Sequence, residues 1–260
     1  MTIMIDIQSQ KDNRKINITK VGVKGIKYPL TVLDRVHGTQ QVNATINMYV
    51  NLPHHFKGTH MSRFVEVLNV YRGEVNIRTL KMILEKVREK LRAESARIEI
   101  GFPYFIEKTA PVSRAKSLME YQCWFLGKNQ ENKTDILVGV TVPVTTVCPC
   151  SKQISNAGAH NQRSMVTVKV RFKKFFWIED LIKTVEDSAS GEVYSLLKRA
   201  DEKFVTEKAY ENPMFVEDVV RNVAGCLNAD DNFTWYSVEA ENYESIHNHS
   251  AYAYVEKEAL

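Results

Sequence analysis

The sequence predicts an α+β protein that consists of two successive ββααββ units with antiparallel sheets. Three observations support this class. Apolar and polar residues alternate with period two in several segments of each half, which is typical of half-buried strands. Between these segments, apolar residues recur with the i, i+3, i+4, i+7 spacing of amphipathic helices. A polar run at residues 128–133 separates the halves, so we assign residues 1–130 to the first unit and 131–260 to the second.

In the first unit, alternation is clearest from Ala44 to Leu52, and helical spacing is clearest from Leu80 to Leu91. A turn region around Gly38 joins the first two strands into a hairpin. The predicted elements are strands 28–36 and 44–52, helices 64–71 and 80–91, and strands 98–102 and 119–125.

The second unit repeats this order, with one addition. Asn212 and Pro213 are predicted to open an extra helix as its N-cap and N1 residues. The connection between the first two strands, TTVCPCSKQISNAGAHNQ, is much longer than the roughly two to five residues usual in hairpins. Its low charge and its Cys and His content favour a functional loop over a disordered one. The predicted elements are strands 136–142 and 166–172, helices 178–185 and 196–210, the helix after residue 212, and strands 233–241 and 251–255.

The composition is that of a globular protein: of 260 residues, 44% are hydrophobic and 25% charged, with a formal net charge of +4. A chain of this length buries a core without disulfides, which excludes disordered and small disulfide-rich classes. We interpret the four cysteines as reduced thiols because they are few and irregularly spaced. No stretch approaches the roughly 18 uncharged residues of a membrane span, and residues 1–15 lack the apolar core of a signal peptide. We expect a soluble, cytoplasmic protein that binds no membrane.

Charge is distributed unevenly along the chain. Residues 1–130 hold 21 basic and 11 acidic side chains, whereas residues 131–260 hold 14 and 20. The first half therefore has either a solvated basic surface or an anionic partner. The sequence contains no block of five or six basic residues and no RNP, zinc-finger or helix-turn-helix pattern, so nucleic acid is not the expected partner.

A group of basic residues precedes the first predicted helix. Lys57, His60 and Arg63 are suited to holding a phosphate at the helix N-terminus, which makes His60 and Arg63 candidate substrate-binding residues. The alternative is a helix that Thr59 or Ser62 caps, with basic neighbours.

Cys148, Cys150 and His160 share the long loop of the second unit. Thiolate and imidazole together suit a borderline-soft ion such as zinc or iron. A CxC pair with one His supplies at most three ligands, so the pattern favours a catalytic metal with an open position over a structural zinc site. The alternative is that both cysteines are small buried apolar residues and His160 is a surface residue.

Further ionisable residues lie near the C-terminus. Glu244, His247 and His249 occupy the turn between the last two predicted strands, where imidazoles suit proton transfer and a carboxylate orients their rings. The alternative is that these three residues are simply solvated residues of a turn. Glu202 follows Lys198 by four residues and Glu217 precedes Arg221 by four, so spacing alone makes each an exposed helical ion pair.

The segments GTHMSRF, CPCSKQISNAGAHNQR, NPMFVEDVVR and ESIHNHSAY together resemble the prokaryotic GTP cyclohydrolase I of type B, the alternative first enzyme of folate biosynthesis. The similarity covers essentially the whole chain. It implies the tandem tunnelling fold, in which ββααββ units associate through their sheets into barrels. It also implies a homotetramer with active sites at subunit interfaces, so that residues 54–63 of one chain serve another.

The resemblance further implies one divalent metal ion, held by Cys148, His160 and Glu202 with an open position for water. Zinc and manganese are the usual ions, and iron is a further candidate. Glu217 matches the carboxylate that binds the purine, and such a carboxylate accepts from guanine N1–H and the exocyclic amine.

The implied reaction converts GTP and water to 7,8-dihydroneopterin triphosphate and formate. A divalent ion makes hydroxide available near pH 7 for addition at C8. Cys148, Glu244, His247 and His249 are the implied catalytic residues. Of these, His247 or His249 protonates the departing ring nitrogen and Glu244 serves the later ring closure.

Two alternative functions are compatible with parts of the sequence. A nitrile reductase of the same fold uses cysteine as a covalent nucleophile, but its ESKS-type nucleotide-binding stretch is not found in this sequence. A non-catalytic metal-binding or nucleic-acid-binding module would explain the basic first half.

Overall fold

The structure is a computed structural model that describes residues 8, 10–73 and 75–257. The chain divides into two compact units. The first compact unit comprises Met1–Phe102 and Trp124–Leu137, and the second comprises Pro103–Cys123 and Val138–Leu260. Strands β3, β4 and β5 therefore contribute residues to both. The proposed boundary between ββααββ units, near residue 130, lies in the turn between β4 and β5 and stays a prediction.

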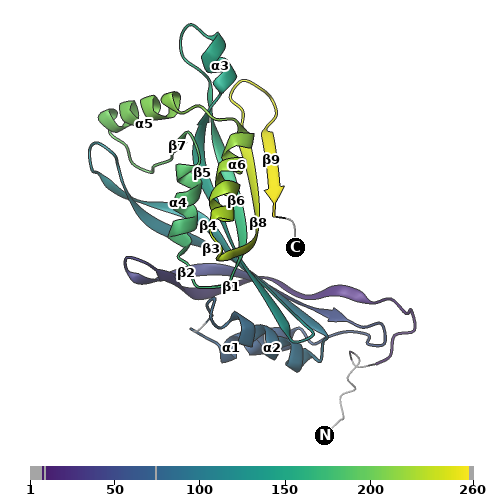
Figure 1. Cartoon of the computed structure of the whole chain (residues 1–260). Coiled ribbons are helices and arrows are strands. Elements are labelled where there is room, and N and C mark those ends of the chain that lie inside the picture. Colours follow the sequence, from purple (N-terminus) through teal and green to yellow (C-terminus); the bar gives the residue numbers. More distant parts are fainter. Residues whose placement is uncertain (1–7, 9, 74, 258–260) are drawn as a thin grey trace. The chain divides into compact units, whose positions relative to one another are not determined.

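The first compact unit is a sheet whose strands follow the order β1-β2-β3-β4-β5, covered by two neighbouring helices (Figure 1). Side chains that alternate along β2 are buried, and the apolar stripes of α1 and α2 are buried as well. Gly127 lets α2 approach β4 closely, because a Cβ there would lie 2.8 Å from Leu84 Cδ1. The elements are β1 (Ile18–Asp34), β2 (Gly38–Leu52), α1 (Ser62–Val70), α2 (Leu80–Leu91), β3 (Ser95–Thr109), β4 (Lys116–Gln130) and β5 (Lys133–Val147).

In the second compact unit the sheet continues in the order β3-β4-β5-β6-β8-β9, and the short β7 pairs with β5. Helix α6 packs on β8 and β9 and contacts α4, as Figure 1 shows. The core consists largely of valines from β5, β6 and α6. The remaining elements are α3 (Pro149–Ile154), β6 (Asn161–Phe172), α4 (Ile178–Asp187), β7 (Gly191–Glu192), α5 (Arg199–Glu211), α6 (Val216–Ala229), β8 (Phe233–Tyr243) and β9 (Ala251–Glu256).

The predicted order of strands and helices is confirmed, but several element ends differ. Strand β1 begins ten residues earlier than predicted, because Gly25 adopts a φ of 74° at a register shift that interrupts the period-two pattern. Asn212 and Pro213 do not open a helix. Asn212 instead ends α5, and α6 begins at Val216.

The long loop also contains structure that the sequence analysis missed, namely the six-residue helix α3. Neither Thr59 nor Ser62 caps α1: its N-cap residue is Met61, and no side chain among the described residues caps it. Within the described ranges, no helix combines the length and the apolar character needed to cross a membrane.

Candidate active site

Cys148 and His160 are brought together at the two ends of the loop between β5 and β6. Cys148 directly follows β5 and is the N-cap residue of α3, where its Sγ accepts a hydrogen bond from the Ser151 amide at 3.4 Å. The Cys148 amide donates to the His160 carbonyl at 3.1 Å, and the His160 amide donates to Ser151 Oγ at 3.1 Å. These bonds close the loop and hold the backbones of Cys148 and His160 side by side.

Glu244 lies beside His160, although it is 84 residues away in the sequence. The distance from His160 Nδ1 to Glu244 Oε2 is 3.7 Å, and the two side chains are only 14% and 11% exposed. This distance is too long for a hydrogen bond, and neither atom has another partner among the described residues. Buried polar atoms without partners are costly, so the pair favours a ligand that satisfies both.

His247 and His249 lie in the turn between β8 and β9, as predicted. Their rings are stacked, with centroids 5.2 Å apart and an interplanar angle of 16°. Both side chains are exposed, as expected of groups that exchange protons with a ligand or with water. Their turn begins at Glu244, so one segment supplies all three predicted proton-handling residues.

Glu202 is placed differently from the other predicted metal ligands. It lies in the first turn of α5 with an exposed side chain. In the part of the chain that the structure describes, no three His, Cys, Asp or Glu side chains gather closely enough to hold a metal ion. The proposed set of Cys148, His160 and Glu202 is therefore not assembled within one chain, and Glu202 as a ligand stays a prediction.

The residue before Glu202 fixes the start of α5. Asp201 is fully buried and accepts hydrogen bonds from the amides of Val112, Ser113 and Lys198 and from the Ser113 hydroxyl. Burial alone would raise the pKa of Asp201, but these hydrogen bonds outweigh it and hold the pKa well below its usual value. The ionised carboxylate thus anchors the turn that carries Glu202.

Glu217 lies in the first turn of α6 and is exposed. Arg221 Nη1 lies 3.7 Å from Asp218 Oδ1. The i, i+4 alternative pairs Arg221 with Glu217 instead. An exposed carboxylate in the first turn of a helix is open to a ligand. The role of Glu217 in purine binding stays a prediction.

Val147, the residue that precedes Cys148, has hydrogen bonds at both its backbone amide and its backbone carbonyl. The Val147 amide donates to the buried Ser190 Oγ at 3.2 Å, and the Val147 carbonyl accepts from the Met214 amide at 3.0 Å. Met214 lies just before α6, so these bonds connect the loop of Cys148 to the helix of Glu217. Neither Ser190 nor Met214 was predictable from the sequence, because contacts so distant in the chain leave no spacing signal.

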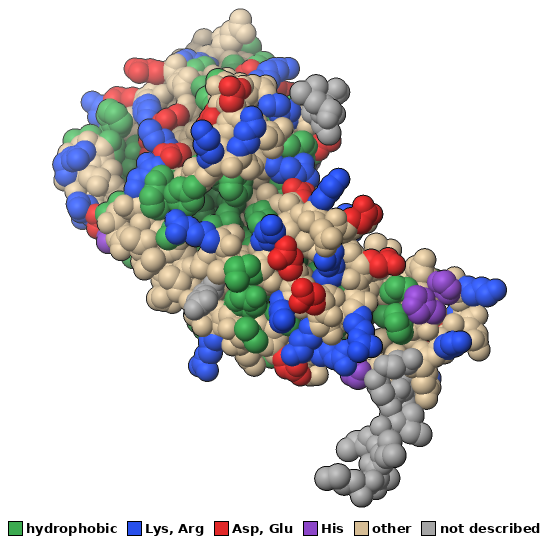
Figure 2. All heavy atoms as spheres, turned by 60° about the horizontal axis from the view of Figure 1, so that its bottom comes forward, with side chains coloured by type: hydrophobic (Ala, Val, Ile, Leu, Met, Phe, Trp, Pro, Cys, Tyr) green, Lys and Arg blue, Asp and Glu red, His purple; other side chains and the backbone are tan. Residues whose placement is uncertain are grey.

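His60 and Arg63 belong to the first compact unit, where both line a cavity of about 190 Å³ together with Arg92. Figure 2 shows Lys and Arg side chains interspersed with acidic ones on the face that carries α1 and α2. Lys57, which was predicted to act with His60 and Arg63, does not line this cavity. It lines a smaller one instead.

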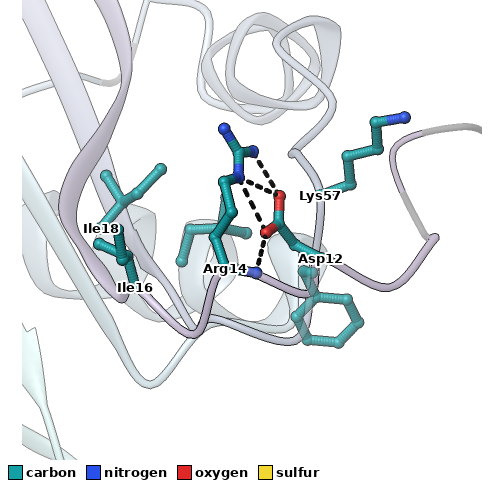
Figure 3. A pocket seen from close by; sticks show the side chains of 7 residues that line it. Asp12, Arg14, Ile16, Ile18 and Lys57 are labelled. Atoms are coloured by element: carbon teal, nitrogen blue, oxygen red, sulfur yellow. Dashed lines mark hydrogen bonds and ion pairs between the residues drawn. The ribbon is translucent and has the colours of Figure 1, made fainter.

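That smaller cavity, of about 140 Å³, is lined by Asp12, Arg14 and Lys57 among others (Figure 3). The Arg14 guanidinium is paired with Asp12, and its hydrogen bonds lower the pKa of that carboxyl to about 2. Because Arg14 is already neutralised by Asp12, the cavity of His60 and Arg63 is the better candidate for a phosphate.

Solved structures of similar fold define the class of protein. A uricase from Bacillus fastidious matches with a TM-score of 0.56 and 6% sequence identity, over 94% of this chain and 93% of that chain. The uricase from Arthrobacter globiformis matches with a TM-score of 0.50 and 8% identity, over 92% of each chain. The likeness confirms the predicted α+β tunnelling fold.

Sequence comparisons define the family. The family model described as type I GTP cyclohydrolase folE2 matches residues 4–253. A GTP cyclohydrolase FolE2 from Syntrophus aciditrophicus is 77% identical over 98% of this chain and 100% of its own length. One from Geobacter metallireducens is 59% identical over 99% and 98%. The chain belongs to this family, which confirms the predicted GTP cyclohydrolase activity in folate biosynthesis.

Proposed function

We propose that the second compact unit carries the metal site of this GTP cyclohydrolase, with Cys148 and His160 as two ligands and Glu202 as the third. The observation that carries the proposal is the closed loop, which joins the backbones of Cys148 and His160 and carries an imidazole whose Nδ1 is buried and lacks a hydrogen bond among the described residues. The product is 7,8-dihydroneopterin triphosphate, with release of formate.

The donor set fits one divalent ion. Sulfur and imidazole donors favour zinc, and a carboxylate in third place also accommodates manganese or iron. When bound, the ion supplies Lewis-acid activation of water near neutral pH. Because the three donors are not assembled within the described part of one chain, Glu202 would complete the set only in the proposed oligomer. It lies on a helix whose first turn is anchored by the buried Asp201.

The remaining residues bind the substrate and move protons. Glu217 accepts two hydrogen bonds from the guanine edge and so orients C8 of GTP toward the ligand residues. His247 or His249 protonates the ring nitrogen that departs when the imidazole ring opens, since both rings are exposed in one turn. Glu244, buried against His160, transfers a proton during ring closure.

We place the triphosphate in the cavity of His60 and Arg63, which is the better of the two cavities for an anion. We also propose a homotetramer of two-unit chains, each divided near residue 130. In such an assembly, residues 54–63 of one chain contribute to the active site of another. We further propose a cytoplasmic location and no nucleic-acid partner.

Removal of the metal tests the proposal. After incubation with a chelator and gel filtration, the protein is expected to release no formate from GTP and to form no fluorescent pterin, because water alone is too weak a nucleophile. Adding zinc or manganese is expected to restore both signals. Metal analysis of the same samples provides the control. Full formate release by protein that contains no metal would refute the proposed site.

Replacing Glu217 with glutamine tests substrate binding separately from metal binding. The variant keeps the size of the side chain but loses one acceptor and its charge, so we expect the KM for GTP to rise about 10–100-fold. Metal content is expected to stay at the wild-type level. Asp218→Asn is the matched control, since Asp218 lies in the same turn and accepts the Phe215 amide at 2.9 Å. An unchanged KM in Glu217→Gln would exclude Glu217 as the purine ligand.

A further inference from the structure

Three polar side chains are buried in the valine-rich sheet of the second compact unit. Thr146 lies on β5, Ser164 on β6 and Asn242 on β8, and their exposed fractions are 0%, 0% and 2%. Asn242 Nδ2 donates to Thr146 Oγ1 at 3.2 Å, and Thr146 Oγ1 lies 3.1 Å from Ser164 Oγ. Because the Thr146 oxygen accepts from Asn242, its own hydrogen is free to point at Ser164. The three side chains thus form one chain of hydrogen bonds across three strands.

These strands lead to three residues of the candidate active site, Cys148, His160 and Glu244. Thr146 lies two residues before Cys148, and Asn242 lies two residues before Glu244. Strand β6 begins directly after His160 and pairs with both neighbours, with Ser164 opposite Asn242. The hydrogen bonds therefore tie the strands together at the level from which the site residues emerge.

Burying these side chains costs free energy that their hydrogen bonds offset only in part, since Asn242 Oδ1 has no hydrogen-bond partner among the described residues. The nearby inward positions on the same strands, Val142, Val144 and Val166, are fully buried valines, which need no hydrogen bonds. Valine has nearly the shape of threonine, so an apolar sheet would fill the same space without the cost of desolvating polar atoms. Hydrogen bonds fix the offset between strands more narrowly than apolar contacts do.

We propose that Thr146, Ser164 and Asn242 form a positioning network that sets the spacing of Cys148, His160 and Glu244. Thr146 is its centre, because it takes part in both hydrogen bonds. The network touches neither substrate nor metal and acts only through the strand ends. The inference rests on the proposed metal site.

The test compares two threonine-to-valine variants of β5. Thr146→Val removes the central hydroxyl. Thr141→Val is the matched control, since Thr141 Oγ1 lies 2.7 Å from Thr167 Oγ1 in a second hydroxyl pair between β5 and β6. Cobalt(II) affinity is measured by competition with a coloured chelator, together with the thiolate-to-cobalt absorption band. We expect Thr146→Val to weaken cobalt binding about 10–100-fold. Thr146→Ser, which keeps the hydroxyl, and Thr141→Val are expected to bind cobalt with the wild-type affinity.

A second measurement uses the metal-free full-length protein. Hydrogen exchange of residues 147–163 is expected to be faster in Thr146→Val than in wild type, because the bond from the Cys148 amide to the His160 carbonyl opens more often. Thr141→Val is expected to exchange at the wild-type rate. Unchanged exchange in Thr146→Val overturns the positioning network. If wild type itself binds no cobalt, the proposed metal site fails, and the exchange rates alone decide the network.

Discussion

Replacing Cys148 with alanine is expected to slow formate release on the order of 10³-fold, equivalent to about 4 kcal/mol of activation free energy. Alanine offers no donor atom, so the proposed ion would keep only His160 and one carboxylate from the protein. The loss is expected to appear as lower metal content and lower kcat, with a smaller change in the KM for GTP, because the proposed purine ligand is Glu217 and not Cys148. Metal analysis and steady-state kinetics on the same preparation check both expectations.

Cys150 offers a matched control for this experiment. It lies two residues further along, on α3, with an exposed side chain. Cys150→Ala removes a thiol from the same loop and is expected to retain metal and at least about half of the activity, since surface substitutions away from a site have small effects. Wild-type metal content in Cys148→Ala would exclude Cys148 from the ligand set. An equal loss in both variants would point to the loop as a whole and not to one thiol.

The fold was predictable from the sequence where its pattern is regular. Strand β2 alternates buried and exposed residues along much of its length, and α2 buries a single apolar stripe. The prediction was wrong where a residue with a typical local role instead makes a contact distant in the sequence. Asn212 has a side chain typical of N-cap residues, yet its side-chain Nδ2 donates to the Ala189 carbonyl, and the residue ends a helix. Capping propensity alone does not specify which helix end a residue occupies.

In the candidate site, too, contacts within one loop were predictable and contacts between distant segments were not. The pair of Cys148 and His160 was predictable because one loop holds both residues. The approach of Glu244 to His160 was not predicted, since it depends on the pairing of β6 with β8, which no local pattern encodes. Sequence analysis grouped Glu244 only with His247 and His249. Burial of Asn242 and Thr146 was missed for the same reason, as both are polar residues at inward positions of strands.

Lys108 is the centre of a buried ion cluster in the second compact unit. Its Nζ lies 2.8 Å from both Glu186 Oε1 and Glu192 Oε2 and donates to the Val193 carbonyl at 3.1 Å. The ammonium also lies 4.4 Å from the centre of the Tyr194 ring. The side chain of Lys108 is only 8% exposed, so water does not substitute for these partners. The cluster joins β3 to α4 and β7.

Replacing Lys108 with methionine is expected to destabilise the protein by about 3 kcal/mol, because the buried Glu186 loses its cation and Glu192 keeps only the more distant Lys208. For a chain of this size, the melting temperature should fall by about 6–12 °C. Lys116→Met is the matched control: Lys116 Nζ lies 2.8 Å from Glu107 Oε1, but the two side chains are 63% and 47% exposed. An exposed pair is worth less than about 1 kcal/mol. Equal shifts in the two variants would contradict a special role for the buried cluster.

The pH dependence of this destabilisation provides an independent check. Burial raises the pKa of Glu186 even with Lys108 present, whereas for Glu192 burial is outweighed by Lys108, which holds the pKa below its ordinary value of 4.5. Without Lys108, both folded-state pKa values rise, and that of Glu186 rises further above the unfolded one, while Glu192 keeps Lys208 at 3.8 Å. The folded variant thus takes up protons on Glu186 as the pH falls. Its stability therefore decreases as the pH rises through that window. Melting curves should show a smaller gap between wild type and Lys108→Met at pH 5 than at pH 8, and a gap that widens toward pH 5 would exclude this account of the cluster.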